Sequence, residues 1–236
     1  MPDALTLSVT ELSVHTPLTR RLRLALGEAP FLYHAGQGVS LGLHGQPERR
    51  PYSIAAAPED ARATGELEFL LRADAAGQVG RHLDGLHVGA RVDLEGPFGG
   101  FTLPDPLPDV PLVFLAGGTG IAPLRAMMRA ARVAGHAAPK HLVYSVRTPD
   151  DVAYAEEWED WGASALGSVR VVVTRPEGRS PGTSRYRLDV HAIAPLLETA
   201  PHAYCFLCGP PTFVDDLVHL LSHLGVRSDH IRHEGW

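Results

Sequence analysis

The feature that most constrains the fold is an apolar run at residues 112–116 (LVFLA) that ends in the turn Gly117-Gly118-Thr119-Gly120. A continuous apolar run is typical of a parallel strand buried on both faces. The residues after the turn carry apolar side chains at helical spacing. Strand, turn and helix in this order leave backbone N–H groups at the helix start, where a pyrophosphate can bind. Such turns also occur for packing alone, so both interpretations stay open.

The rest of the second half alternates between strand and helix patterns. Such alternation predicts right-handed crossovers and a parallel, Rossmann-like sheet with helices on both faces. On the first helix, Arg125, Arg129 and Arg132 lie away from the apolar positions, and we expect them to form a solvated face. The predicted strands are 111–116, 140–146, 168–174 and 203–208, and the predicted helices are 120–134, 151–161, 189–199 and 211–224.

The first half instead shows short alternating runs separated by turn residues, with a helical pattern only at 77–86. This predicts an antiparallel Greek-key β-barrel of about six strands. Three prolines within 102–109 mark a stiff linker. We therefore predict a barrel domain at 1–103, a linker at 104–110 and an α/β domain at 111–236. The predicted strands are 5–14, 20–26, 38–43, 50–55, 66–72 and 90–95.

Composition excludes several classes of protein. A net charge of −6 over 236 residues gives no basic excess for nucleic acid. No apolar run approaches the roughly 20 residues that cross a bilayer, and no signal peptide is recognisable, so we expect a cytoplasmic protein without membrane insertion. The two cysteines, Cys205 and Cys208, are too few for a four-thiolate iron–sulfur cluster, and on a strand they face opposite sides. The histidine spacing predicts no metal site.

A second motif, Arg50-Pro51-Tyr52-Ser53, lies in the first half. Period-two alternation puts Arg50 and Tyr52 on one face of a strand, where a guanidinium can bind phosphate and a phenol ring can stack on a flat ring. The Ser53 hydroxyl can donate to or accept from a ring nitrogen. An ordinary strand with an edge proline fits the same residues.

With these motifs in this order, the chain resembles the ferredoxin–NADP(H) reductase superfamily of flavoproteins over nearly its whole length. Residues 50–53 match the flavin-binding R-x-Y-S/T segment, and residues 117–123 match the nucleotide loop. Cys208-Gly209-Pro210 matches the C-G-P motif, and Glu234-Gly235-Trp236 resembles the terminal E-x-aromatic. Gly77-Gln78-Val79-Gly80 occupies the place of G-x-V/M-S, with Gly80 where the family has serine.

The resemblance implies that 1–103 is a flavin-binding domain and 111–236 an NAD(P)-binding domain, and it implies roles for these residues. Ser53 would lie near flavin N5, Cys208 beside the nicotinamide and Glu234 near both, so these three are the predicted catalytic residues. Trp236 would cover the flavin ring. Loss of the serine hydroxyl at Gly80 leaves backbone N–H groups and Arg81 for the diphosphate. The residues assigned to cofactor binding are Arg50, Pro51, Tyr52, Ser53, Arg72, Gly77, Gln78, Val79, Gly80, Gly117, Gly118, Thr119, Gly120, Pro123, Thr174, Arg175, Cys208, Gly209, Pro210 and Trp236.

The implied function is an NAD(P)H-dependent flavoprotein oxidoreductase that passes electrons through FAD, rather than FMN, to a separate acceptor: a ferredoxin, a flavodoxin or an oxygenase component. Thr174 and Arg175 resemble the 2′-phosphate site of NADPH-dependent members, and Arg147, Arg179 and Arg185 can add charge, so we favour NADPH over NADH. One alternative is an NAD(P)H:flavin oxidoreductase that releases reduced flavin. Another is a non-enzymatic subunit that relays electrons or senses nucleotide.

Overall fold

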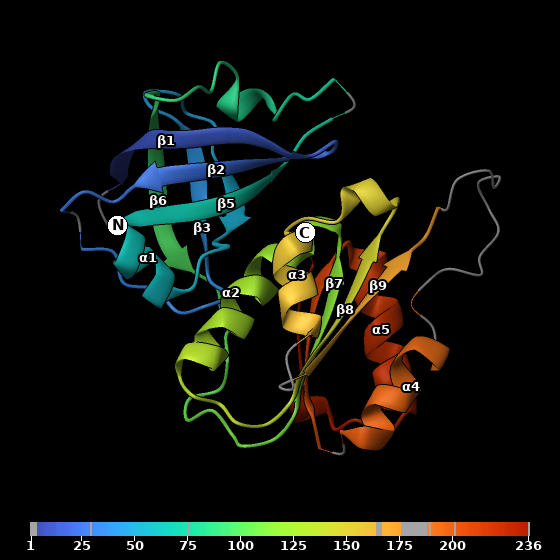
Figure 1. Cartoon of the computed structure of the whole chain (residues 1–236). Helices are drawn as coiled ribbons and strands as arrows, with labels where there is room; N and C mark the ends of the chain where they lie inside the picture. Colours follow the sequence, from blue (N-terminus) through green and yellow to red (C-terminus); the bar gives the residue numbers. More distant parts are fainter. Residues whose placement is uncertain are drawn as a thin grey trace.

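The computed structural model describes residues 4–28, 30–74, 76–163, 167–175, 188, 190–200 and 202–235. The chain forms two sheets, one antiparallel and one parallel (Figure 1). Figure 1 shows the antiparallel sheet, coloured blue to green, beside the parallel sheet, coloured green to red, with helix α2 (Ile121–Val133) between them. The predicted fold class is confirmed, whereas the linker predicted at 104–110 stays a prediction.

The antiparallel sheet has the strand order β4-β3-β6-β1-β2-β5. A bridge between Ile54 and Phe69 joins its two edges, so the sheet curls into a barrel. Apolar side chains such as Leu22, Val39 and Phe69, which are fully buried, fill the interior. The strands are β1 (Leu5–Thr16), β2 (Thr19–Ala25), β3 (Gly38–Leu43), β4 (Arg50–Ser53), β5 (Glu66–Arg72) and β6 (Arg91–Phe98).

Two local predictions for the barrel are wrong. The segment 77–86 forms only a 3₁₀ turn at Arg81–Leu83, because Gly77 and Gly80 adopt positive φ angles that interrupt a helix. A short helix, α1 (Pro58–Thr64), instead follows β4. Its signals were present in the sequence: proline in the first turn, acidic residues beside it and Gly65 as a left-handed C-cap. Because Ala61 is the one buried residue of this helix, its sequence shows no helical periodicity.

The parallel sheet has the order β11-β10-β7-β8-β9, as expected for a Rossmann-like domain. Each predicted strand and helix of this half is present within a few residues of its predicted bounds, and β11 was missed. The strands are β7 (Leu112–Gly117), β8 (Lys140–Val146), β9 (Gly167–Val173), β10 (Tyr204–Gly209) and β11 (Ile231–Gly235). The remaining helices are α3 (Ala155–Gly162), α4 (Val190–Thr199) and α5 (Pro211–His223).

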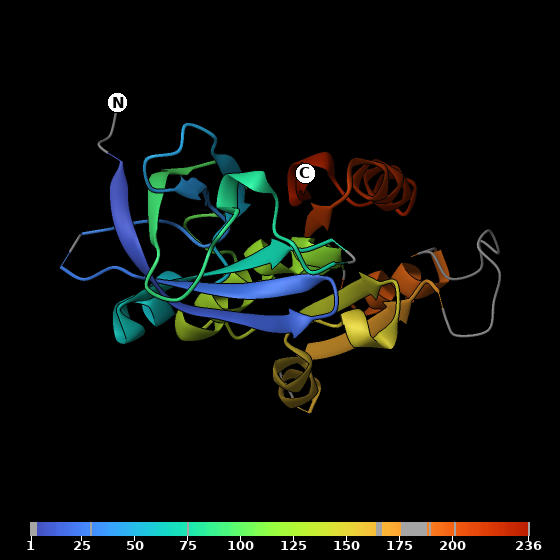
Figure 2. The ribbon, with the colours of Figure 1, turned by 90° about the horizontal axis from the view of Figure 1, so that it is seen from above.

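Helices cover both faces of this sheet (Figure 2). Phe114 and Cys208 face the core beneath α2 and α3, whereas Cys205 and Leu207 face the core beneath α4 and α5. The two cysteines therefore point to opposite faces of β10, as their spacing predicts. Both are free thiols and both are buried.

The expectation that the arginines of α2 form a solvated face is wrong for two of them. The side chain of Arg125 is only 12% exposed and donates to Ala55 O (2.9 Å), Glu68 (3.2 Å) and Glu157 (2.6 Å). Arg129 binds Asp60 of α1 and Glu157 of α3. Only Arg132 is exposed. Apolar periodicity gave no sign of this, because the face opposite the parallel sheet packs against the barrel.

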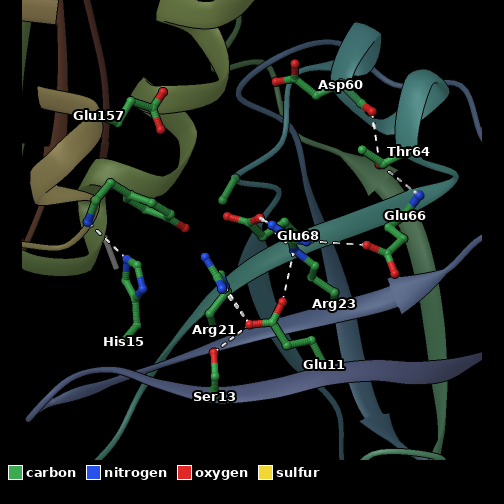
Figure 3. A network of polar contacts seen from close by, with 12 residues as sticks. Glu11, Ser13, His15, Arg21, Arg23, Asp60, Thr64, Glu66, Glu68 and Glu157 are labelled. Atoms are coloured by element: carbon green, nitrogen blue, oxygen red, sulfur yellow. Dashed lines mark hydrogen bonds and ion pairs between the residues drawn. The ribbon is translucent and has the colours of Figure 1, made fainter. Parts of the chain in front are cut away.

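We call this cluster, Arg125, Arg129, Glu157, Glu68 and Asp60, the interdomain ion network. Figure 3 shows its barrel side, where Glu68 of β5 also binds Arg23 of β2 at 3.1 Å. Buried charges are stable only when they are paired and hydrogen-bonded. The network therefore requires both domains to be docked for its charges to be satisfied.

A candidate active site between the two domains

A pocket with an empty volume of about 810 Å³ lies between the barrel and the parallel sheet. It is lined on the side of the parallel sheet by the turn at Gly117–Thr119, which was predicted as the nucleotide loop. The barrel forms the facing wall through the tip of the β1–β2 hairpin and through Arg72. The lining residues are Thr16, Leu18, Thr19, Arg72, Gly117, Gly118, Thr119, Tyr144, Ser145, Val146, Arg147, Asp151, Thr174, Pro210 and Phe213.

The glycines of the turn are glycine for different physical reasons. Gly118 has φ +55° and open space around its missing side chain, so only glycine combines this conformation with room for a ligand. Gly120 is buried, and a Cβ there would overlap the carbonyl of Cys208, so it permits α2 to approach β10. The packing interpretation therefore applies to Gly120, and nucleotide binding at Gly118 stays a prediction. Pro123 lies in the first turn of α2 and is buried.

Beside the pocket, the structure brings together the three predicted catalytic residues. Ser53 Oγ at the end of β4 donates to Glu234 Oε2 of β11 at 3.5 Å. Glu234 pairs in register with Cys208 of β10, and β10 continues into Gly209 and Pro210 at the pocket. The parallel pairing of β10 and β11 brings Cys208 beside Glu234, and the docking of the barrel brings Ser53, 181 positions from Glu234, to the same place. Their chemical roles stay predictions.

Burial dominates the electrostatics of this group. It raises the pKa of Glu234 above its usual range, and the hydrogen bond from Ser53 opposes that shift. Burial, reinforced by the Glu234 carboxylate, also raises the pKa of Cys208. The thiol therefore stays protonated at neutral pH and acts as a small apolar group rather than as a nucleophile. Glu234 is a carboxyl that takes up a proton more readily than an exposed one.

Tyr52 of β4 is half-buried, and its hydroxyl forms a 2.8 Å hydrogen bond with His82 Nε2. The two rings stack with centroids 5.7 Å apart. Burial raises the pKa of Tyr52 to about 12. Arg50, two residues earlier on the strand, is 59% exposed and binds Glu48 at 2.9 Å. Pro51 between them is exposed. A cation, an aromatic hydroxyl and a buried imidazole thus gather at one end of the barrel.

The segment predicted to hold the diphosphate is a tight turn closed by Asp74. Its Oδ1 accepts hydrogen bonds from the backbone N–H groups of Ala76 and Gln78, each at 2.9 Å. Gly77 has φ +82°, and a Cβ there would overlap the Arg20 guanidinium. Val79 packs against the barrel core. Part of the backbone donor capacity of this segment is therefore already taken by a carboxylate.

Of the residues predicted to bind the 2′-phosphate, some line the pocket and others do not. Thr174 lines the pocket and donates from Oγ1 to Val146 O at 3.0 Å, whereas the exposed Arg175 is not part of the lining. Arg147, at the end of β8, lines the pocket. Arg179, Arg185 and Trp236 lie outside the described residues.

Of the barrel residues that line this pocket, sequence reasoning predicted Arg72 and missed the tip of the β1–β2 hairpin. Thr16 and Thr19 flank that tip, and their hydroxyls bond each other at 2.8 Å. The two strands were predicted, but no signal in the sequence pointed to their turn as part of a site. Ser145 and Val146 were detectable, because β8 is parallel to β7 and must end at the same edge of the sheet.

Comparison with known proteins agrees with this architecture. The family model for the oxidoreductase FAD-binding domain matches residues 6–103, and that for the oxidoreductase NAD-binding domain matches residues 114–219. Ferredoxin–NADP reductase B of Sorangium cellulosum is 36% identical over 93% of this chain and 92% of its own length. The chain belongs to the ferredoxin–NADP(H) reductase superfamily. It carries the FAD-binding domain first and the NAD-binding domain second, and the resemblance inferred from its motifs is confirmed.

Other members of the superfamily are longer. The reductase component of propane 2-monooxygenase from Rhodococcus jostii is 31% identical over 91% of this chain and 60% of its own length. The chain thus spans about 60% to two thirds of the length of the oxygenase reductases that it matches. Among solved structures, an Amycolatopsis cytochrome P450 reductase superposes with a TM-score of 0.82 at 30% identity, covering 99% of this chain and 69% of that one.

The residues around the site fit the two cofactors that the superfamily uses. On the barrel side, the phenol of Tyr52, the cation of Arg50 and the buried Nδ1 of His82 suit a flat ring that carries phosphate. On the other side, Gly118 leaves a cradle that a Cβ would fill, and Arg147 and Thr174 supply a cation and a hydroxyl. Within the described residues, no cluster of His, Cys, Asp and Glu suits a metal ion, and no helix is long and apolar enough to span a membrane.

Proposed function

We propose that this protein is a reductase that takes electrons from NADPH through bound FAD to a separate redox protein: a ferredoxin, a flavodoxin or an oxygenase component. The observation that carries the proposal is the meeting of Ser53 from the barrel with Glu234 and Cys208 from the parallel sheet, next to an interdomain pocket.

When bound, the flavin supplies hydride acceptance and onward electron transfer. The chain's residues then act mainly by position. The Gly117–Thr119 turn and the N-terminus of α2 bind the pyrophosphate. The apolar thiol of Cys208 and the hydroxyl of Ser53 hold the reacting rings in contact. Glu234 Oε2 accepts a hydrogen bond from Ser53 Oγ, and its raised pKa permits this carboxyl to hold a proton.

Preference for NADPH rests on Arg147, which lines the pocket together with Thr174. A guanidinium suits a 2′-phosphate, and the free 2′-hydroxyl of NADH gains less from the charge.

The test is anaerobic stopped-flow mixing of the purified protein with NADPH or NADH, followed by a screen of oxidised acceptor proteins. We expect bound FAD to bleach faster with NADPH, and an iron–sulfur or flavin protein to reoxidise it. A protein that is colourless, and active only with excess added flavin, would instead be a flavin oxidoreductase. The Asp74 carboxylate that occupies part of the diphosphate segment is the observation that favours this second function. If neither nucleotide bleaches the bound flavin, only the non-enzymatic role remains.

A further inference from the structure

His82 is a buried histidine that the mechanism above does not use. It is 3% exposed and lies in the 3₁₀ turn directly after the diphosphate segment Gly77–Gly80. Its Nε2 bonds the Tyr52 hydroxyl at 2.8 Å, while its Nδ1 is buried without a hydrogen-bond partner among the described residues. A buried polar atom left unpaired is destabilising, so it requires an explanation.

His82 is also the physical reason for glycine at position 80. A Cβ at Gly80 would lie 3.0 Å from His82 Cε1 and 3.1 Å from Nδ1, and the φ of +30° disfavours any other residue. The imidazole thus crowds the position that a serine Cβ would take, and the positive φ disfavours a serine there as well.

The Tyr52–His82 pair has one hydrogen-bond donor to spare. Burial, with a smaller effect of Arg50, lowers the pKa of His82, so its ring is neutral at pH 7 and carries one N–H. The Tyr52 hydroxyl, whose pKa is raised, carries a second proton. Their mutual hydrogen bond uses one of the two. With the Tyr52 hydroxyl donating to Nε2, the other lies on Nδ1, which has no partner among the described residues and needs an external acceptor.

We propose that His82 replaces the missing serine, and that the Tyr52–His82 pair gives its spare donor to a phosphate group of bound flavin. Arg50 lies on the same face of β4 and supplies a cation beside the pair, which favours a phosphate oxygen over an uncharged acceptor. The inference rests on the proposed function, because it requires flavin at this end of the barrel. It makes His82 a positioning residue for the cofactor and Gly80 its necessary neighbour.

The experiment titrates the flavin-free full-length protein with FAD, FMN and riboflavin, with flavin fluorescence as the signal. His82→Phe keeps a ring against Tyr52 and removes both nitrogens. We expect about tenfold weaker binding of FAD and FMN, as for the loss of one hydrogen bond, and unchanged binding of riboflavin. His219→Phe, on an exposed face of α5, is the matched control and should leave all three affinities unchanged. An equal loss for all three flavins, or no loss for FAD, would overturn the proposal.

A second variant tests the pair as a unit. Tyr52→Phe leaves the Nδ1–H of His82 in place, so it should lose less FAD affinity than His82→Phe, and the double variant Tyr52→Phe/His82→Phe should match His82→Phe. A loss in Tyr52→Phe as large as that in His82→Phe would place the donor on the Tyr52 oxygen and overturn the role of His82. Suppose that the unaltered protein binds FAD, that NADPH bleaches this FAD, and that His82→Phe binds FAD normally. The inference about His82 then fails, while the proposed function stands. If the unaltered protein binds no flavin, the proposed function fails with it.

Discussion

The boundary between the two domains has two sides that differ in what fills them. On one side, the interdomain ion network fills the interface with buried charge. On the other, a pocket of about 810 Å³ remains open between the β1–β2 hairpin and the ends of β7 and β8. Helix α2 serves both, since its preceding turn lines the pocket and Arg125 and Arg129 lie in the network. We infer that the filled side fixes the docking of the domains, so that the open side is preformed.

The strongest test of this comparison removes the charge at the centre of the filled side. Arg125→Ala leaves Glu68 and Glu157 partly unpaired, and loss of one partner of a buried ion pair costs about 3–5 kcal/mol. We expect a fall of that order in the free energy of unfolding, measured by urea denaturation. Arg132→Ala, on the exposed face of the same helix, is the control and should change it by less than about 1 kcal/mol. Equal effects of the two variants would mean that the network does not hold the domains.

The second prediction alters the open side alone. Arg147→Ala removes a cation from the pocket wall. Because a charged hydrogen bond contributes about 1.5–3 kcal/mol, we expect kcat/KM for NADPH to fall about 10- to 100-fold while that for NADH changes little. Arg227→Ala, which breaks an exposed pair with Asp229, should leave both unchanged. A parallel fall for both nucleotides would show that Arg147 does not select the 2′-phosphate.

A smaller effect is expected where the two domains meet at Ser53. Ser53→Ala removes the hydroxyl that bonds Glu234 across the boundary. We expect flavin reduction to slow about tenfold, the equivalent of one hydrogen bond of about 1.4 kcal/mol, with flavin still bound. Stopped-flow absorbance measures the rate, and the protein's absorbance spectrum reports the bound flavin. Unchanged reduction kinetics would remove the role assigned to this hydroxyl.

The smallest effect concerns the protonation of Glu234. Its pKa is raised in the folded protein by burial, so the fold favours the protonated carboxyl. Stability from this group is present below its unfolded pKa and is lost as the pH rises through the raised, folded value. The unfolding free energy of Glu234→Gln relative to the unaltered protein should therefore increase with pH across this acidic window. Denaturation series at several pH values measure it, and a difference independent of pH would contradict the raised pKa.

The secondary structure of the second domain could be predicted because its strands and helices are long and strongly periodic. Shorter elements were harder to predict. Helix α1 buries one residue, and the edge strand β11 has a mixed sequence without alternation. The candidate site could be anticipated at Ser53, Cys208 and Glu234 because their motifs match a family pattern. His82 and the Thr16–Thr19 hairpin tip carry no such motif, and they join the site only through contacts between distant parts of the chain.

The sequence by itself determined the two domain types, their order and the glycine turn, because periodicity and turn chemistry are local properties. Only the tertiary structure decided which face of α2 is solvated, why position 80 is glycine and where the pocket's second wall comes from. Arg125 has the same local surroundings as any exposed helix residue, and its burial follows from the position of β5 and α3 around it. Such burial depends on packing between segments far apart in the chain, which no local pattern encodes.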